Sequence, residues 1–269
     1  MLNRPRALVL GFILALTLPV GAPVAAQEAV PLRVLFVGNS YIYFNDLPSV
    51  IGDLATAAHE SRPFVAEQVL VGAATLERHL ALGDAMTAIQ RGGWDVVVLQ
   101  EQSTRPINNP ALMLRDARTL AEAVKKTGAT IVWYETWAKE IEPSTQDSLT
   151  RGYHRAAAAT GGRVAHVGEA WAAFRAAETV APGAHSALFV TDGSHPSEAG
   201  TYLAASVFYA TLYGKSPVGL PATSRTTRQQ PPHGPPAGAP KKEIPRDIAA
   251  RLQELAWATT TSAAGSTDR

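Results

Sequence analysis

Three residues of this sequence could together activate a hydroxyl group for attack on a carbonyl carbon. Ser40 directly follows a short apolar run, and Asp192 and His195 stand close together far downstream. A serine hydroxyl is a weak nucleophile until a histidine accepts its proton and a carboxylate orients that histidine. The order Ser, Asp, His therefore predicts a catalytic triad for acyl transfer, provided that the fold brings the three side chains together.

The local sequence around each of these residues favours such a site. Asp192 and His195 are separated by two residues, so a carboxylate on a tight turn can reach back to the imidazole. Pro196 suits the first turn of a following helix, which would anchor His195 at the start of that helix. Ser40 stands at a strand-to-helix turn, where backbone N–H groups point toward whatever binds there. Taken singly, a turn serine and a helix-capping aspartate explain the same motifs.

Acyl transfer also requires hydrogen-bond donors for the oxyanion that forms on the substrate. Gly72 ends a second apolar segment and offers a backbone N–H, while Gln100 and Gln102 follow a third segment and offer side-chain amides. Without such a site, Gly72 would be an ordinary turn glycine and the two glutamines would be the polar end of a strand. The argument for a site is that all these groups follow successive strands, whose carboxyl ends meet at one edge of a parallel sheet.

Short apolar segments alternate with segments of helical periodicity along most of the chain. The predicted strands are 32–37, 64–71, 94–99, 130–134 and 163–167. The predicted helices are 47–59, 76–89, 109–126, 144–160, 169–177 and 197–213. Nearly continuous apolar strands are typical of a sheet that is covered on both faces. The alternation therefore predicts an α/β fold with five parallel strands and helices on both sides.

The first residues have the layout of a secretory signal peptide. Two arginines precede an apolar run, and small residues stand before Gln27, so residues 1–26 are predicted to be removed by cleavage near Ala26/Gln27. An uncleaved anchor is the alternative, but the run is short for crossing a bilayer and contains Pro19. We therefore expect a bacterial protein that is periplasmic or secreted, with no stable membrane insertion after cleavage.

The remaining chain divides into one folded domain and a C-terminal extension. Residues 27–215 are expected to form the domain, and the proline-rich residues 216–243 a flexible segment. Residues 244–260 have apolar positions on one face, which predicts a helix that docks on the domain, and 261–269 are expected to be a disordered tail.

Composition excludes several classes of function. The net charge is +1, which does not favour a nucleic acid or an acidic polymer as partner. The absence of cysteine excludes disulfides, cysteine nucleophiles and thiolate metal sites. The histidines show no metal-binding spacing, so no metal and no cofactor are expected. Glu101 and Glu135 could suggest a glycosidase carboxylate pair, but nothing in the sequence fixes their separation.

Four blocks of the sequence together resemble those of a known family. They are Gly38 to Ser40, Gly72, Leu99 to Ser103 and Asp192 to Pro196, and they resemble the blocks of the SGNH hydrolases, also called GDSL-like esterases and lipases. The resemblance covers residues 32–213. It implies a flavodoxin-like, three-layer α/β/α sandwich around a five-stranded parallel sheet. It also implies Ser40 as nucleophile, His195 and Asp192 as its partners, and the N–H groups of Ser40 and Gly72 in the oxyanion hole.

The chain departs from the family pattern in two of these blocks. Asn39 stands where the GDSL name has aspartate, and the third block has Gln-Glu-Gln-Ser in place of Gly-x-Asn-Asp. By position, Gln102 replaces the asparagine that completes the oxyanion hole in the family, with Gln100 as the fallback. Asn39, Glu101 and Trp137 are the side chains expected to contact the substrate, Trp137 by stacking on a sugar or an acyl group.

The combined expectation is an exported serine esterase for short, acetyl-type acyl groups, with a small molecule or a glycan as the esterified substrate. The absence of a large lid insertion favours a small acyl group over a lipid chain. Two alternatives stay open. One is a non-catalytic module that binds glycan or cell wall through the same edge, and the other is a hydrolase of sulfate or phosphate monoesters.

Overall fold

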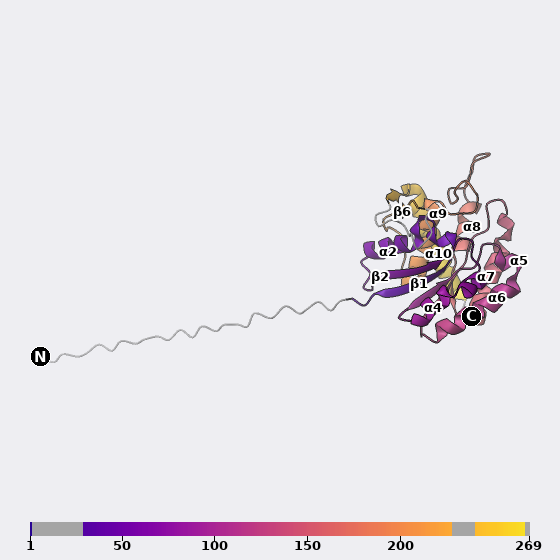
Figure 1. Cartoon of the computed structure of the whole chain (residues 1–269). Helices are drawn as coiled ribbons and strands as arrows, with labels where there is room; N and C mark the ends of the chain where they lie inside the picture. The colour runs from indigo at the N-terminus through magenta and orange to yellow at the C-terminus, as the bar shows by residue number, and fades with distance from the viewer. Residues whose placement is uncertain (2–28, 228–239, 267–269) are drawn as a thin grey trace.

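A five-stranded parallel sheet forms the centre of the computed structural model, which describes Met1 and residues 29–227 and 240–266 (Figure 1). In spatial order the strands are β2 (Phe64–Leu70), β1 (Leu32–Gly38), β3 (Val96–Leu99), β4 (Thr130–Tyr134) and β5 (Arg163–Ala165). Each neighbouring pair is parallel. The order 2-1-3-4-5 is that of flavodoxin-like sheets, and it confirms the predicted fold class.

The sheet separates two hydrophobic cores. Val34 and Phe36 of β1 belong to one core, whereas Leu35 and Val37 belong to the other, because successive side chains of a strand point to opposite faces. The first core includes residues of four helices: α2 (Leu47–Ala57), α8 (Val167–Ala176), α9 (Glu198–Tyr213) and α10 (Arg246–Ser266). The second includes residues of α3 (Leu76–Leu82), α4 (Asp84–Arg91), α6 (Pro110–Lys125) and α7 (Gln146–Thr160). These helices complete a three-layer sandwich.

Some elements differ from those predicted. The single helix expected over 76–89 is divided into α3 and α4, because Gly83 takes a φ of 85° and ends α3 with a left-handed cap. Two one-turn helices, α1 (Ser40–Tyr43) and α5 (Arg105–Asn108), were not predicted. The two 3₁₀ turns are η1 (Phe44–Asp46) and η2 (Pro143–Thr145). Both α1 and α5 lie in loops at the carboxyl edge of the sheet.

The C-terminal extension is more regular than expected. Strands β6 (Thr223–Arg225) and β7 (Lys241–Glu243) pair antiparallel within the segment predicted to be flexible. Helix α10 packs on α8 and α9, and it continues to Ser266, six residues past the predicted end at 260. The predicted signal peptide falls almost wholly outside the described residues, as do 228–239 and 267–269. In the part that is described, no helix is long and apolar enough to cross a membrane.

Candidate active site

Ser40 is the first residue of α1, immediately beyond β1. Asn39 caps this helix through its Oδ1 atom, which accepts a hydrogen bond from the Tyr41 N–H at 3.2 Å. The Asn39 side chain also donates to the Ala74 carbonyl at 3.0 Å, and its backbone N–H donates to Gln100 Oε1 at 2.9 Å. Asn39 is only 3% exposed, so its side chain fixes the turn that presents Ser40. This corrects the expectation that Asn39 contacts substrate.

Asp192 and His195 lie on a tight hairpin before α9. Gly193 takes a φ of 63° and donates its N–H to the Val190 carbonyl at 3.0 Å. Asp192 Oδ1 accepts the N–H groups of Ser194 and His195, each at 2.8 Å. Such a turn favours glycine at the position with positive φ.

Helix α9 starts later than predicted. Ser197 is its N-cap and accepts a hydrogen bond from the Gly200 N–H, so the first helical residue is Glu198. Pro196 therefore lies in the turn before the helix and not in its first turn, which corrects the expected anchoring of His195. The hairpin holds His195 instead, through a hydrogen bond from the Val190 N–H to the His195 carbonyl at 3.1 Å.

The fold brings the three predicted residues into one hydrogen-bonded line. His195 Nε2 lies 2.8 Å from Ser40 Oγ, although the two residues are 155 positions apart. His195 Nδ1 lies 2.6 Å from Asp192 Oδ2. Burial acts to raise the pKa of Asp192, but the hydrogen bonds from His195 and Ser194 outweigh it and hold that pKa below its ordinary value. The Asp192 carboxylate can thus accept a hydrogen bond from Nδ1–H, which leaves Nε2 unprotonated and able to take the proton of Ser40.

Aromatic rings surround the imidazole of His195. Phe44 stacks on it with the ring centroids 4.1 Å apart and the planes 14° from parallel. Tyr41 meets its edge at 5.7 Å and donates or accepts a 2.8 Å hydrogen bond with Ser194 Oγ. Trp137 stacks on Tyr41 at 4.5 Å and donates its indole N–H to the Ser194 carbonyl at 2.9 Å. Since Trp137 is only 1% exposed, the expectation that it stacks on substrate is wrong, and its ring supports the hairpin from within.

Comparison with solved structures relates this arrangement to known hydrolases. A protein from Slackia heliotrinireducens that is assigned to the SGNH hydrolases is 31% identical, with 68% of this chain and 99% of that chain covered at a TM-score of 0.54. The chain belongs to the SGNH hydrolases. It is therefore a hydrolase, and the resemblance seen in the four sequence blocks is confirmed.

Other solved structures share the fold at lower identity. A DUF4886 family protein from Bacteroides uniformis is 14% identical at a TM-score of 0.65, with 86% of this chain and 95% of that chain covered. An acetyl xylan esterase from Geobacillus stearothermophilus is 16% identical at a TM-score of 0.52, with coverages of 67% and 94%. No protein-family profile and no curated protein matches the sequence.

The second SGNH block lies beside the segment that carries Ser40. Gly72 belongs to the turn after β2, in which the Val71 N–H donates to the Gly38 carbonyl at 3.1 Å. The same turn is closed by the Ala74 N–H on the Val71 carbonyl and is fastened to Asn39 through the Ala74 carbonyl. Gly72 is thus held next to the segment that carries Ser40, and its part in an oxyanion hole stays a prediction.

The third block is arranged differently from the family pattern. Gln102 Oε1 accepts hydrogen bonds from the N–H groups of Thr104 and Arg105 at 2.9 and 3.1 Å, and its Nε2 donates to Ser103 Oγ at 3.1 Å. The amide is therefore bound to its own loop, where it organises the start of α5. Gln100 is fully buried. Its side-chain oxygen accepts the Asn39 N–H, and its side-chain nitrogen donates to the Glu101 carbonyl. Each amide nitrogen already donates one hydrogen bond within the protein, and the assignment of Gln102 to the oxyanion hole, with Gln100 as the fallback, stays a prediction.

Glu101 holds two loops of the site together, a role that the sequence around it did not indicate. Its carboxylate is fully buried, so the expected contact with substrate is wrong. One oxygen accepts the N–H groups of Leu76 and Gln102 at 3.2 and 2.7 Å, which joins the start of α3 to the loop after β3. Burial is the main cause that raises the pKa of Glu101 to about 7.

Asn45 is a further residue that the sequence did not single out. It adopts a positive φ of 55°, and its side-chain amide donates to the Pro196 carbonyl at 3.1 Å and to Thr201 Oγ1 at 3.0 Å. It therefore ties the segment after Ser40 to the segment after His195. The only sequence signal is an Asn-Asp pair after an aromatic run, since these residues tolerate the left-handed region.

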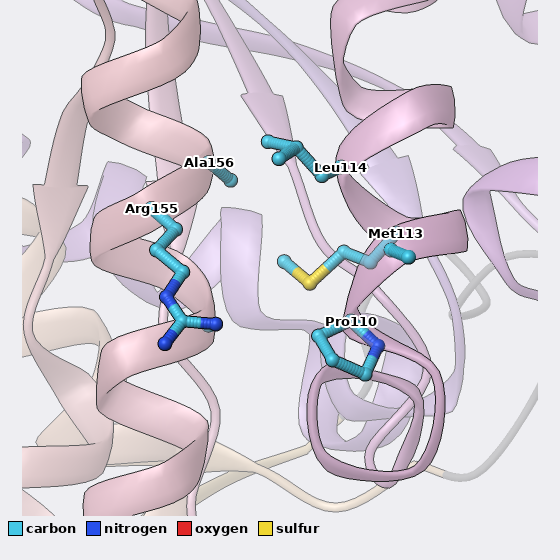
Figure 2. A pocket seen from close by; sticks show the side chains of 7 residues that line it. Pro110, Met113, Leu114, Arg155 and Ala156 are labelled. Carbon is cyan, nitrogen blue, oxygen red and sulfur yellow. The ribbon is translucent and has the colours of Figure 1, made fainter.

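A separate hollow of about 200 Å³ lies between α6 and α7. Figure 2 shows Pro110, Met113 and Leu114 facing Arg155 and Ala156 across it. The triad residues take no part in its lining, so this hollow is not part of the active site.

Proposed function

We propose that this SGNH hydrolase is an exported serine esterase that cleaves short, acetyl-type acyl groups from carbohydrate esters. The proposal rests on one observation, the continuous line of hydrogen bonds from Ser40 Oγ through His195 to Asp192. Those distances, 2.8 and 2.6 Å, are within the range that proton transfer in a triad requires.

In the proposed reaction, Ser40 Oγ attacks the ester carbonyl carbon while His195 Nε2 takes the hydroxyl proton. The imidazolium is stabilised by Asp192, and the oxyanion accepts hydrogen bonds from the N–H groups of Ser40 and Gly72. His195 then donates its proton to the leaving alcohol, which gives an acyl-enzyme on Ser40. Water attacks this ester with His195 as base, and the carboxylic acid is released as Ser40 regains its proton.

The acyl and carrier groups are inferred from two sources. The sequence shows no large insertion that would be expected to form a lid, which favours a small acyl group. Proteins described as acetyl xylan esterases share the fold, which supports acetylated polysaccharide as the substrate class. Export is proposed on the signal-peptide pattern of residues 1–26, and N-terminal sequencing of the mature protein tests it.

The decisive experiment measures hydrolysis of p-nitrophenyl acetate, butyrate and octanoate and release of acetate from acetylated xylan. We expect turnover that falls with acyl length and is lost in Ser40→Ala, while Ser144→Ala, at an exposed serine outside the site, keeps wild-type rates. Mass spectrometry should find an acyl or fluorophosphonate adduct on Ser40.

Two results would contradict the proposal. Binding of glycan without turnover in either form would identify a non-catalytic module. Turnover only of p-nitrophenyl sulfate or phosphate would identify a different hydrolase.

A further inference from the structure

Four metal-binding side chains gather away from the triad. They come from the residue after β4, from α7, from the residue after β5 and from α8, and they are Glu135, His154, His166 and Glu169. One potential ligand atom of each lies within 4.8 Å of those of the other three. We propose that this cluster, here called the β4–β5 cluster, binds a divalent cation of the Zn²⁺ type. The proposal does not depend on the esterase activity.

Glu135 is the reason for expecting a cation. It is fully buried, and its Oε1 atom accepts hydrogen bonds from Thr150 Oγ1 at 2.7 Å and from Gln146 Nε2 at 3.2 Å. Its Oε2 atom has no hydrogen-bond partner in the described part of the chain and points toward His166, 3.4 Å from Nδ1. Among the described residues, no lysine or arginine pairs with this carboxylate. A buried carboxylate oxygen is costly unless a positive group faces it.

The geometry of the cluster is close to that of a coordination sphere. Metal bonds of about 2.0–2.2 Å place tetrahedral ligand atoms roughly 3.3–3.6 Å apart. The separation of 3.4 Å between Glu135 and His166 matches this, whereas His166 Nδ1 and Glu169 Oε2, at 2.6 Å, would have to move apart. His154 is exposed and Glu169 is partly exposed, so both can rotate to meet an ion. Thr150 and Gln146 hold the buried carboxylate of Glu135 in place through hydrogen bonds, as residues outside the ligand shell do in metal sites.

The donor set indicates which ion fits. Two imidazoles with two carboxylates suit Zn²⁺ and similar transition metals, whereas Ca²⁺ and Mg²⁺ prefer oxygen ligands alone. The cluster joins β4, β5, α7 and α8, and the chain has no cysteine for disulfides. A bound ion would therefore cross-link the ends of β4 and β5 to α7 and α8 and stabilise this side of the sheet.

A protonated His166 held between two carboxylates is the competing explanation. That ion pair is complete without His154, whose ring meets His166 edge-on at 5.2 Å. A metal ion would use the His154 nitrogen as a ligand. Removal of His154 therefore separates the two explanations.

The test uses the purified, untagged, chelator-treated chain and ZnCl₂ as the probe. Equilibrium dialysis with metal analysis should give about one Zn²⁺ per chain. At 100 times the dissociation constant, the melting temperature should rise by roughly 5–10 °C. Zn²⁺ binding and the rise in melting temperature should both be lost when His154→Ala is combined with Glu169→Gln. In His154→Ala alone, which changes an exposed side chain, the affinity for Zn²⁺ should fall at least tenfold.

His185→Ala is the matched control. His185 also pairs with a carboxylate, Glu140, at 2.6 Å, but lies outside the cluster, so this variant should bind Zn²⁺ normally. Absence of stoichiometric Zn²⁺, or binding that is unchanged in the double variant, would overturn the proposal. Binding that is lost only in His195→Ala would also overturn it, because the ion would then be at the triad.

Discussion

The Phe44 ring lies parallel to the His195 imidazole, with the centroids 4.1 Å apart. Phe44 directly follows α1, the one-turn helix that begins at Ser40, so the segment that carries Ser40 also packs against the ring of His195. A stacked ring restricts rotation of the imidazole about its side-chain bonds. The Ser40–His195 distance of 2.8 Å therefore depends on Phe44 as well as on Asp192.

Replacing Phe44 should reduce catalysis with little effect on substrate binding. Aromatic pairs contribute about 0.5–1.5 kcal/mol beyond buried area, which corresponds to roughly a 2–10-fold loss of kcat in Phe44→Leu. Phe44→Tyr keeps the ring and should retain most activity. The measurement is kcat and KM on p-nitrophenyl acetate. Equal kcat values in the leucine and tyrosine variants would show that the stacking has no catalytic role.

Asp192→Asn should be far more harmful although it is nearly isosteric. The asparagine oxygen can keep the hydrogen bonds from the Ser194 and His195 N–H groups, but its NH₂ would then face His195 Nδ1. This arrangement favours the tautomer with the proton on Nε2, which cannot accept a proton from Ser40. We expect kcat to fall by about 10²–10⁴-fold, the upper value being that of the analogous change in serine proteases.

The Asp192 side chain is 47% exposed, so solvent competes for the imidazole and the loss could lie toward the lower limit. Stopped assays at several pH values and an unfolding curve check this variant. An unchanged kcat in a fully folded protein would remove Asp192 from the mechanism.

The sheet could be predicted because its strands carry a strong and simple signal. Residues such as Val96 to Leu99 are apolar without interruption, and a run as short as this is typical of a strand that is buried on both faces. Strand boundaries agreed within two residues. The division between α3 and α4 was missed because the apolar residues keep helical spacing on both sides of Gly83. A single glycine inside such a pattern does not by itself indicate that the helix ends.

The triad could be predicted because its chemistry demands particular residue types, whereas its supports use residues that are common everywhere. Phe44 and Asn45 contact the His195 segment only through the tertiary fold, from more than a hundred residues away. Trp137 was assigned to the wrong surface because a sequence shows that an aromatic residue ends a strand but not whether its ring points inward.

Trp137→Phe should weaken the hairpin that carries His195. This change removes the indole N–H from the Ser194 carbonyl, and loss of a buried partner costs about 1–3 kcal/mol. Trp171→Phe is the matched control, because Trp171 stacks on Trp137 at 3.8 Å and is equally buried, while its indole N–H has no hydrogen-bond partner among the residues that the structure describes. We expect kcat to fall several-fold more in Trp137→Phe than in Trp171→Phe. Comparable kcat values in the two variants would show that the hydrogen bond from Trp137 to the Ser194 carbonyl does not contribute to catalysis.

Glu101 should make the folding stability depend on pH near neutrality. Its pKa is about 7 in the folded chain and close to 4.5 when the group is unperturbed. Between these values the folded chain holds a proton that the unfolded chain has released, so the free energy of unfolding decreases as pH rises. The contribution is present in full below pH 4.5 and is lost by about pH 7. The shift corresponds to about 3 kcal/mol at most.

Glu101→Gln isolates this contribution, because its amide oxygen can still accept the N–H groups of Leu76 and Gln102 while the side chain no longer titrates. Urea unfolding at pH 5 and pH 8 should show that the wild type loses stability relative to this variant as pH rises. Glu77→Gln is the control, since ion pairs with Arg105 and Arg115 lower the pKa of Glu77 and place its titration below this window. If the wild-type and Glu101→Gln curves stay parallel from pH 5 to pH 8, the Glu101 carboxyl titrates at an ordinary pKa, and the loop after β3 is held by something other than a protonated acid.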